Sequence, residues 1–221
     1  MISASLVKKS VLLSLLVQIT TGLVQLYGLF LNLPEKHHIL NSILATETIV
    51  QFVEAAFYTW LAYGLYKMKD VTSTRYYDWV ITTPMMLLAT IVYFKYLESS
   101  EVFTFTEFIF ENMYNIGLIF AYNWLMLLCG FLGETKKINM NLGIFVGFIF
   151  FGLLFKNIYE NYTTTEGAMH LYTFLIIVWS LYGVAAMMST NLKNLMYNIL
   201  DIISKNFYGL FIFYKVLQVA N

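Results

Sequence analysis

Long apolar stretches follow one another along the chain, separated by short polar connections. Each stretch approaches or exceeds the roughly 20 residues that cross the hydrocarbon core of a bilayer as an α-helix. The connections are too short to form a soluble domain, so any functional site must lie among the helices. The pattern predicts seven membrane-spanning helices, at residues 10–31, 40–66, 76–97, 110–132, 138–159, 168–188 and 194–219.

The composition agrees with this pattern. Of the 221 residues, 59% are apolar and 12% are charged, whereas a soluble globular domain has roughly 25% charged residues. The first stretch is longer than the core of a signal peptide and no small-residue cleavage site follows it, so we expect it to remain as the first helix. We therefore predict an all-α integral membrane protein in which residues 1–221 form one domain, with lipid and no nucleic acid as its surroundings.

Six charged residues interrupt the predicted spans. A charged side chain at the centre of a bilayer costs about 2.5–3.5 kcal/mol, so each should face the bundle interior and have a partner. Asp201 and Lys205 are four residues apart, which places them on one face of a helix. Spacing alone leaves two interpretations open, an ion-pair cluster that holds helices together or a functional site. The six residues are Glu47, Glu54, Arg75, Asp78, Asp201 and Lys205.

Three segments carry a more specific signal. RYYDWVITTP (75–84) and DIISKN (201–206) resemble the third-helix and seventh-helix signatures of the microbial rhodopsins, and WSLY (179–182) resembles part of their sixth helix. The resemblance extends over all seven predicted spans in order. It implies a seven-helix bundle that binds all-trans retinal as a Schiff base at Lys205. It implies neither an enzymatic reaction nor a metal site.

The same resemblance assigns further residues. It implies that Asp78 and Asp201 are counterions of the Schiff base and that Thr82 forms a hydrogen bond near Asp78. The chemistry agrees, because an imine nitrogen needs a lysine, its proton needs a nearby anion and a polyene needs flat aromatic walls. The residues implied to line the retinal pocket are Trp79, Thr83, Trp179 and Tyr182.

Two departures from the family pattern bear on the pocket. The sixth helix has Gly183 and Ala186 where a proline and a tryptophan are usual, so we expect that side of the pocket to be roomier. The span at 138–159 lacks the usual tryptophans. The pocket residues of the fourth and fifth helices therefore stay unassigned.

The proton relay of an outward pump is incomplete in this sequence. The position five residues beyond Pro84, where such pumps hold a carboxylate that donates a proton, is Ala89. The beginning of the seventh span lacks the pair of glutamates from which such pumps release the proton. The sequence thus lacks proton-carrying groups at both ends of the expected path.

Polar residues instead recur at helical spacing on three predicted helices. The second helix repeats them at Glu47, Gln51, Glu54 and Tyr58, which share one face. Amide and hydroxyl groups can join helices by hydrogen bonds, but a glutamate is a costly way to achieve this in lipid. The other stripes are Ser14, Gln18, Thr21 and Gln25, and Asn194, Asn198, Asp201 and Lys205.

A row of carboxylates on the second helix also resembles the channelrhodopsins, and the absent pump relay resembles the channel-forming rhodopsins of large viruses. This resemblance implies that Glu54 is a central gate and that Glu47 lies nearer the mouth. We therefore expect a light-gated channel for monovalent cations or protons, with its path between the first, second, third and seventh helices. A light-driven outward proton pump and a photosensor without transport are the alternatives, and assembly into a homo-oligomer stays open. The expected gate and path residues are Ser14, Glu47, Gln51, Glu54, Arg75, Thr82 and Asn198.

The orientation in the membrane is ambiguous. The N-terminal side carries seven lysines outside the spans, namely Lys8, Lys9, Lys67, Lys69, Lys136, Lys137 and Lys193. The opposite side carries four, namely Lys36, Lys95, Lys156 and Lys215. This count favours a cytoplasmic N-terminus, whereas the family resemblance implies an extracellular one.

Overall fold

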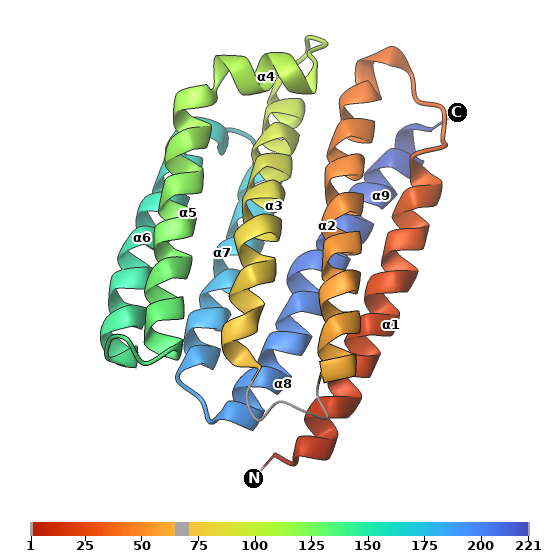
Figure 1. The fold of residues 1–221 in the computed structure, drawn as a ribbon. Coiled ribbons are helices and arrows are strands. Elements are labelled where there is room, and N and C mark those ends of the chain that lie inside the picture. The colour runs from red at the N-terminus through yellow and green to blue at the C-terminus, as the bar shows by residue number, and fades with distance from the viewer. Residues whose placement is uncertain (1, 65–70, 221) are drawn as a thin grey trace.

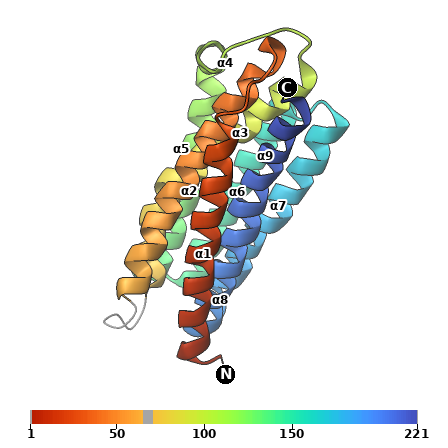
Figure 2. The same ribbon diagram turned by 90° about the vertical axis from the view of Figure 1, so that its right-hand side faces the viewer.

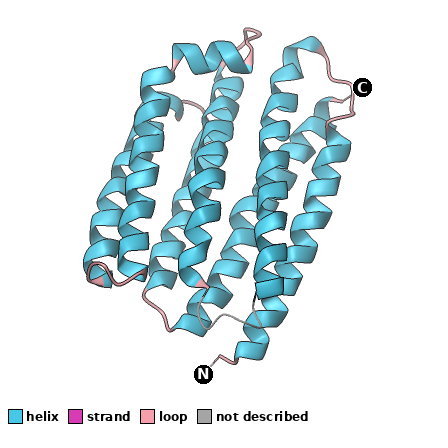
Figure 3. Ribbon diagram, viewed as in Figure 1, coloured by secondary structure: helices cyan, strands magenta, loops and turns pink. Residues whose placement is uncertain are grey.

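Seven helical segments form an elongated bundle (Figure 1). The computed structural model describes residues 2–64 and 71–220, and within them the chain forms helices and turns without strands (Figure 3). The first six segments are α1 (Ala4–Gly28), α2 (His38–Gly64), α3 (Arg75–Glu98), α5 (Met113–Glu134), α6 (Met140–Tyr162) and α7 (Glu166–Ala186). The seventh consists of α8 (Thr190–Asp201), the π-helical turn η3 (Ile202–Asn206) and α9 (Phe207–Val219).

The predicted spans coincide with these segments, with two corrections. The first helix begins at Ala4 and not at residue 10, because Ser3 caps it by accepting a hydrogen bond from the backbone N–H of Leu6 at 3.2 Å. The fourth span begins at Met113 and not at residue 110, because the helix is interrupted at Asn112. Residues 65 and 66 of the second predicted span, and Lys67 and Lys69, lie outside the described residues.

The short helix α4 (Phe105–Glu111) precedes this break and lies across one end of the bundle (Figure 1). Thr104 and Glu107 form a capping box, in which each side chain accepts a hydrogen bond from the other residue's backbone N–H, at 3.2 and 2.8 Å. Hydrogen bonding of the Glu107 carboxyl to Thr104 lowers the pKa of that carboxyl. Phe108 points into the bundle and is buried, so α4 covers the end of the bundle instead of extending a span.

The helices form a closed ring. Successive helices pack against each other, and the seventh segment returns to contact both α1 and α2. Figure 2 shows α1, α9 and α7 along one side of the molecule, and Figure 1 places the two termini at opposite ends. This arrangement brings α1, α2 and the seventh segment together although they lie far apart in the sequence.

The bundle is apolar outside and partly polar inside. Within the described residues, five helical segments are long and apolar enough to cross a membrane; α2 and the seventh segment are not among these five. On α1 the leucines at positions 12, 16 and 23 are exposed, whereas Ser14, Gln18 and Gln25 are buried. Because lipid solvates apolar groups and polar groups need partners, this inverted amphipathicity suits a bundle in a bilayer.

Candidate functional site

Three carboxylates from three helical segments surround one lysine. The Lys205 Nζ atom, in η3, contacts the Glu54 carboxylate of α2 and lies 3.1 Å from Asp78 Oδ2 of α3 and 3.5 Å from Asp201 Oδ1 of α8. All four side chains are buried. The Thr82 hydroxyl donates to the backbone oxygen of Asp78 at 3.1 Å, one turn along α3. Buried charges are tolerated where they are paired in this way, and π-helical turns such as η3 are frequent at functional sites.

Asp201 is held by hydroxyl groups as well as by cations. Tyr58 donates to Asp201 Oδ2 at 2.6 Å and Tyr182 donates to Asp201 Oδ1 at 2.8 Å. Arg75 forms an ion pair with the same carboxylate at 3.3 Å. Two cations, Arg75 and Lys205, thus face three carboxyl groups, so the cluster has one carboxyl in excess.

Arg75 also closes the bundle toward the N-terminal end. Its guanidinium group is fully buried and donates to the side-chain oxygens of Asn198 at 2.5 Å and Asn194 at 3.3 Å. The Ser14 hydroxyl of α1 donates to the backbone oxygen of Asn198 at 3.3 Å. Residues from α1, α3 and α8 therefore meet in one hydrogen-bonded layer on this side of Lys205.

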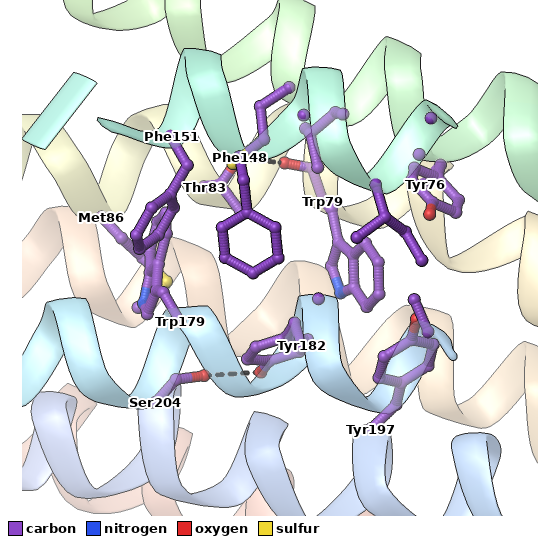
Figure 4. A pocket seen from close by; sticks show the side chains of 18 of the residues that line it. Tyr76, Trp79, Thr83, Met86, Phe148, Phe151, Trp179, Tyr182, Tyr197 and Ser204 are labelled. Carbon is purple, nitrogen blue, oxygen red and sulfur yellow. Dashed lines mark hydrogen bonds between the residues drawn. The ribbon is translucent and has the colours of Figure 1, made fainter. Parts of the chain in front are cut away.

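An apolar cavity is lined by residues of α3, α5, α6, α7 and the seventh segment (Figure 4), and Lys205 is among them. Its cavity volume is about 120 Å³. Its walls are mostly aromatic and aliphatic, and Ser204 and Lys205 of the seventh segment form part of them. An amine in the wall of an apolar cavity fits a flat apolar molecule that carries a carbonyl group. The walls include Tyr76, Met86, Met126, Leu127, Gly130, Ile144, Phe148, Phe151 and Tyr197.

The four pocket residues expected from the sequence all line this cavity. They are Trp79, Thr83, Trp179 and Tyr182. The Thr83 hydroxyl donates to the backbone oxygen of Trp79 at 2.6 Å and accepts from Asn123 of α5 at 2.8 Å. The structure therefore gathers these side chains and Lys205 around one space.

The α6 wall was not assigned from the sequence, and it changes one expectation. Gly143 and Gly147, one turn apart on α6, line the cavity together with Phe148. The Phe148 ring packs against Gly183 so closely that a Cβ atom at Gly183 would lie 2.6 Å from the ring. The roomier pocket expected beside Gly183 is therefore wrong in part, because Phe148 occupies the space. The glycine repeat of α6 is the sequence signal that could have indicated this wall.

The three polar stripes face one another and form a polar seam, which we define as the buried polar residues shared by α1, α2 and the seventh segment. The Gln18 amide of α1 approaches the Glu54 carboxylate at 3.5 Å. Asn206 donates to the side-chain oxygens of Gln18 at 3.0 Å and Gln51 at 2.8 Å, which ties the three helices together. Asn206 was missed because its neighbour Lys205 defined the predicted stripe. The seam comprises Ser14, Gln18, Thr21, Gln25, Glu47, Gln51, Glu54, Tyr58, Asn194, Asn198, Asp201, Lys205 and Asn206.

The position of the missing pump carboxylate is apolar in the structure. Ala89 of α3 is fully buried in the core. The nearest polar residue along the helix, Thr90, donates to the Tyr208 hydroxyl at 3.1 Å. The third helix therefore offers no carboxyl between Asp78 and its end at Glu98.

Comparisons with known proteins agree with the fold. The sequence matches the family model of bacteriorhodopsin-like proteins over residues 6–219. The structure is similar to that of the viral rhodopsin OLPVRII, with 28% sequence identity and a TM-score of 0.88, covering 98% of this chain and all of that one. Among curated protein sequences, none is significantly similar to this chain.

More distant structures share the same fold. The rhodopsin of Exiguobacterium sibiricum is 16% identical with a TM-score of 0.79, and the match covers 100% of both chains. The blue light-absorbing proteorhodopsin from Med12 is 17% identical with a TM-score of 0.78, and the match covers 96% of this chain and 97% of that one.

Proposed function

Because this chain belongs to the family of bacteriorhodopsin-like proteins, whose members bind retinal, we propose that it is a light-gated cation channel with all-trans retinal attached to Lys205. The observation that carries the proposal is the polar seam, which runs buried beside Lys205 between α1, α2 and the seventh segment. Residues 1–221 act as one retinal-binding domain. The cargo is a monovalent cation or a proton.

The residues around the cavity have different roles in binding retinal. Lys205 provides the nitrogen for the Schiff base, while Trp79, Trp179 and Tyr182 give the polyene its flat walls. Thr83 is fixed between α3 and α5 by its two hydrogen bonds. Bound retinal supplies a light-driven isomerisation, which reorients the charge at Lys205.

Asp78 and Asp201 act as counterions, since both lie within 3.5 Å of Lys205 Nζ. Asp201 keeps its orientation through Tyr58 and Tyr182. A displaced charge at Lys205 weakens its ion pairs with Asp78 and Asp201. It also alters the ion pair between Asp201 and Arg75, because these charges share one low-dielectric space.

Two layers of the seam close the ion path in the dark. The layer on the N-terminal side consists of Arg75, Asn198 and Ser14. The layer at Lys205 contains Glu54, whose carboxylate contacts Lys205 and accepts from Gln18. When the charge at Lys205 shifts, Glu54 loses its partner, so this layer can open to water and cations. Gln51 and Glu47 continue the path, and Thr82 lies beside Asp78 at its edge.

Patch-clamp recording under illumination tests the proposal. A channel gives a photocurrent that reverses sign with the cation gradient. Glu54→Gln removes the charge from the central layer, so we expect conductance or cation selectivity to change. Glu98→Gln, on an exposed carboxylate outside the seam, leaves both unchanged. A current of one sign at every voltage would instead identify a pump.

A light-driven outward proton pump is the second candidate. Asp78 supports it, because its carboxylate lies 3.1 Å from Lys205 Nζ and could accept a proton from that atom. A photosensor without transport would show no current in the same recording. We also propose an extracellular N-terminus, in line with the family resemblance.

A further inference from the structure

A buried ion pair lies at the N-terminal end of the bundle, outside the cluster around Lys205. Lys193 of α8 donates to both carboxylate oxygens of Glu134, the last residue of α5, at 2.9 and 3.0 Å. The two side chains are only 8% and 7% exposed. Apolar side chains of similar size often hold helices together equally well, so the burial of these two charges points to a role beyond packing.

Both partners extend a helix face that lines the cavity. On α5, Leu127, Gly130 and Glu134 follow at intervals of three and four residues, which places them on one side of the helix. Leu127 and Gly130 line the cavity, so Glu134 lies one turn beyond it toward the N-terminal end of the bundle (Figure 1). On α8, Tyr197 lines the cavity and Lys193 precedes it by one turn. The ion pair therefore lies directly beyond this end of the cavity.

Two tyrosines line the cavity beside the ion pair. Tyr76 of α3 and Tyr197 both pack edge-on against Trp79, with ring centroids 5.1 Å apart in each case, and Figure 4 shows them at the same end of the cavity. A Cβ atom at Gly130 would lie 2.6 Å from the Tyr76 hydroxyl oxygen, so the glycine leaves room for that hydroxyl. The Glu134 charge acts on the hydroxyls of both tyrosines. The tyrosines and the ion pair thus form one closure.

The same turn of α8 also closes the polar seam. Asn194, the residue after Lys193, accepts a hydrogen bond from Arg75 at 3.3 Å and donates to the Thr72 hydroxyl at 3.0 Å. Water from the N-terminal side therefore meets two closures side by side. Asn194 lies before the seam and Lys193 lies before the cavity, and both spaces lead to Lys205.

We propose that the ion pair between Glu134 and Lys193 keeps water out of the cavity and thereby protects the bond at Lys205 from hydrolysis. In that reaction the C=N bond of the Schiff base breaks. The oxygen of one water molecule becomes the carbonyl oxygen of free retinal, and its two hydrogens go to Lys205 Nζ, which leaves as an ammonium group. Both members of the pair are positioning residues. Their role rests on the proposed attachment of retinal to Lys205 but not on channel activity.

Thiol labelling of the retinal-free protein gives the first test. Leu127→Cys places a thiol in the cavity wall of a chain whose Cys129 is replaced by serine. A charged methanethiosulfonate reaches this thiol through water and not through lipid. We expect Glu134→Gln to speed the labelling about 10-fold, because the rate follows the population of the open form. Exchange of the two charges, Glu134→Lys with Lys193→Glu, should restore slow labelling.

Glu160→Gln is the matched control for this labelling. It breaks a carboxylate–lysine pair with Lys156 that is exposed, so labelling should stay slow. Lys193→Gln removes the other partner of the buried pair and should act like Glu134→Gln, which keeps the test decisive if one of these two variants does not fold. Labelling that is equally fast with and without the pair, or fast in the exchanged variant, would overturn the proposal whether or not retinal binds.

Bleaching of the retinal-bound protein in the dark gives the second test. Hydroxylamine, a small water-soluble nucleophile, takes the place of the Lys205 nitrogen and releases retinal as its oxime, so the loss of the visible band reports access from water. We expect bleaching about 10-fold faster in Glu134→Gln, and the wild-type rate in the exchanged variant and in Glu160→Gln. An unchanged rate in a coloured Glu134→Gln protein would refute this inference alone, whereas a wild-type protein that stays colourless would refute the proposed attachment of retinal.

Discussion

At the scale of single residues, Lys205 combines two environments. Its nitrogen lies among Glu54, Asp78 and Asp201, and the same residue lines the apolar cavity. A structural ion pair would need only the first environment. The cavity supplies the reason for a lysine at this position, because an amine can bind a carbonyl compound covalently whereas an arginine cannot.

Lys205→Ala should therefore abolish pigment formation. Lys205 is the lysine among the residues that line the cavity, so without it added all-trans retinal has no amine with which to form the Schiff base. The measurement is the visible absorption band after retinal is added to membranes that contain the variant. Lys215→Ala is the control, since Lys215 lies on α9 and bonds to Gln218 outside the cavity. A visible band retained by Lys205→Ala would contradict the assignment of the attachment site.

At the scale of helices, the sequence predicts the features that are determined within a single helix, namely its position and its buried face. The positions of the seven segments follow from apolar stretches of spanning length, and the buried faces of α1, α2 and the seventh segment follow from polar residues at helical spacing. The break at Asn112 was missed because the predicted span was extended back to residue 110 across the polar pair Glu111 and Asn112. The separate short helix before it begins at the capping box of Thr104 and Glu107.

Contacts between helices were predicted less well. Glu54 and Lys205 lie on different predicted helices, and the pattern within each helix does not indicate a contact. The structure nevertheless brings their charged groups into contact. The π-helical turn η3 changes the direction of the side chains that follow it, and the apolar pattern carries no sign of this turn. Likewise, Phe148 fills the space beside Gly183 because two helices happen to approach there, which no pattern within either helix encodes.

The contact between α6 and α7 gives a prediction at this scale. A side chain at Gly183 would push the Phe148 ring toward the cavity, and overpacking of this kind costs about 1–3 kcal/mol. Gly183→Val should therefore weaken retinal binding roughly 10-fold or more, measured as half-saturation of pigment formation. Adding Phe148→Ala to the same chain should restore binding.

Gly152→Val is the matched control for this steric argument. Gly152 lies on the same helix as Phe148, and no atom would lie within 4 Å of its added Cβ. Binding in this variant should equal that of the wild type. If Gly183→Val binds retinal normally, the Phe148 ring does not border the occupied part of the cavity.

At the scale of the whole molecule, the site divides the bundle into two unequal halves. Toward the N-terminal end, Arg75 and the asparagines at positions 194 and 198 form a closely bonded layer. Toward the C-terminal end, both carboxylate oxygens of Glu47 and both amide atoms of Gln25 are buried without a hydrogen bond to the described residues. The direction in which a proton or cation moves across the membrane therefore depends on which end faces the cytoplasm.

Labelling of single cysteines determines that orientation. Lys137, in the turn between α5 and α6, and Ser100, between α3 and α4, are exposed and lie at opposite ends of the bundle (Figure 1). With Cys129, the single cysteine of the chain, replaced by serine, a membrane-impermeant maleimide should label Lys137→Cys in intact cells and Ser100→Cys only after permeabilisation. The lysine count opposes this outcome, but Lys193 is buried and paired with Glu134 at 2.9 Å, which leaves six of the seven lysines on that side. The reverse labelling pattern would place the end of the seam that contains Glu47 nearer the extracellular side.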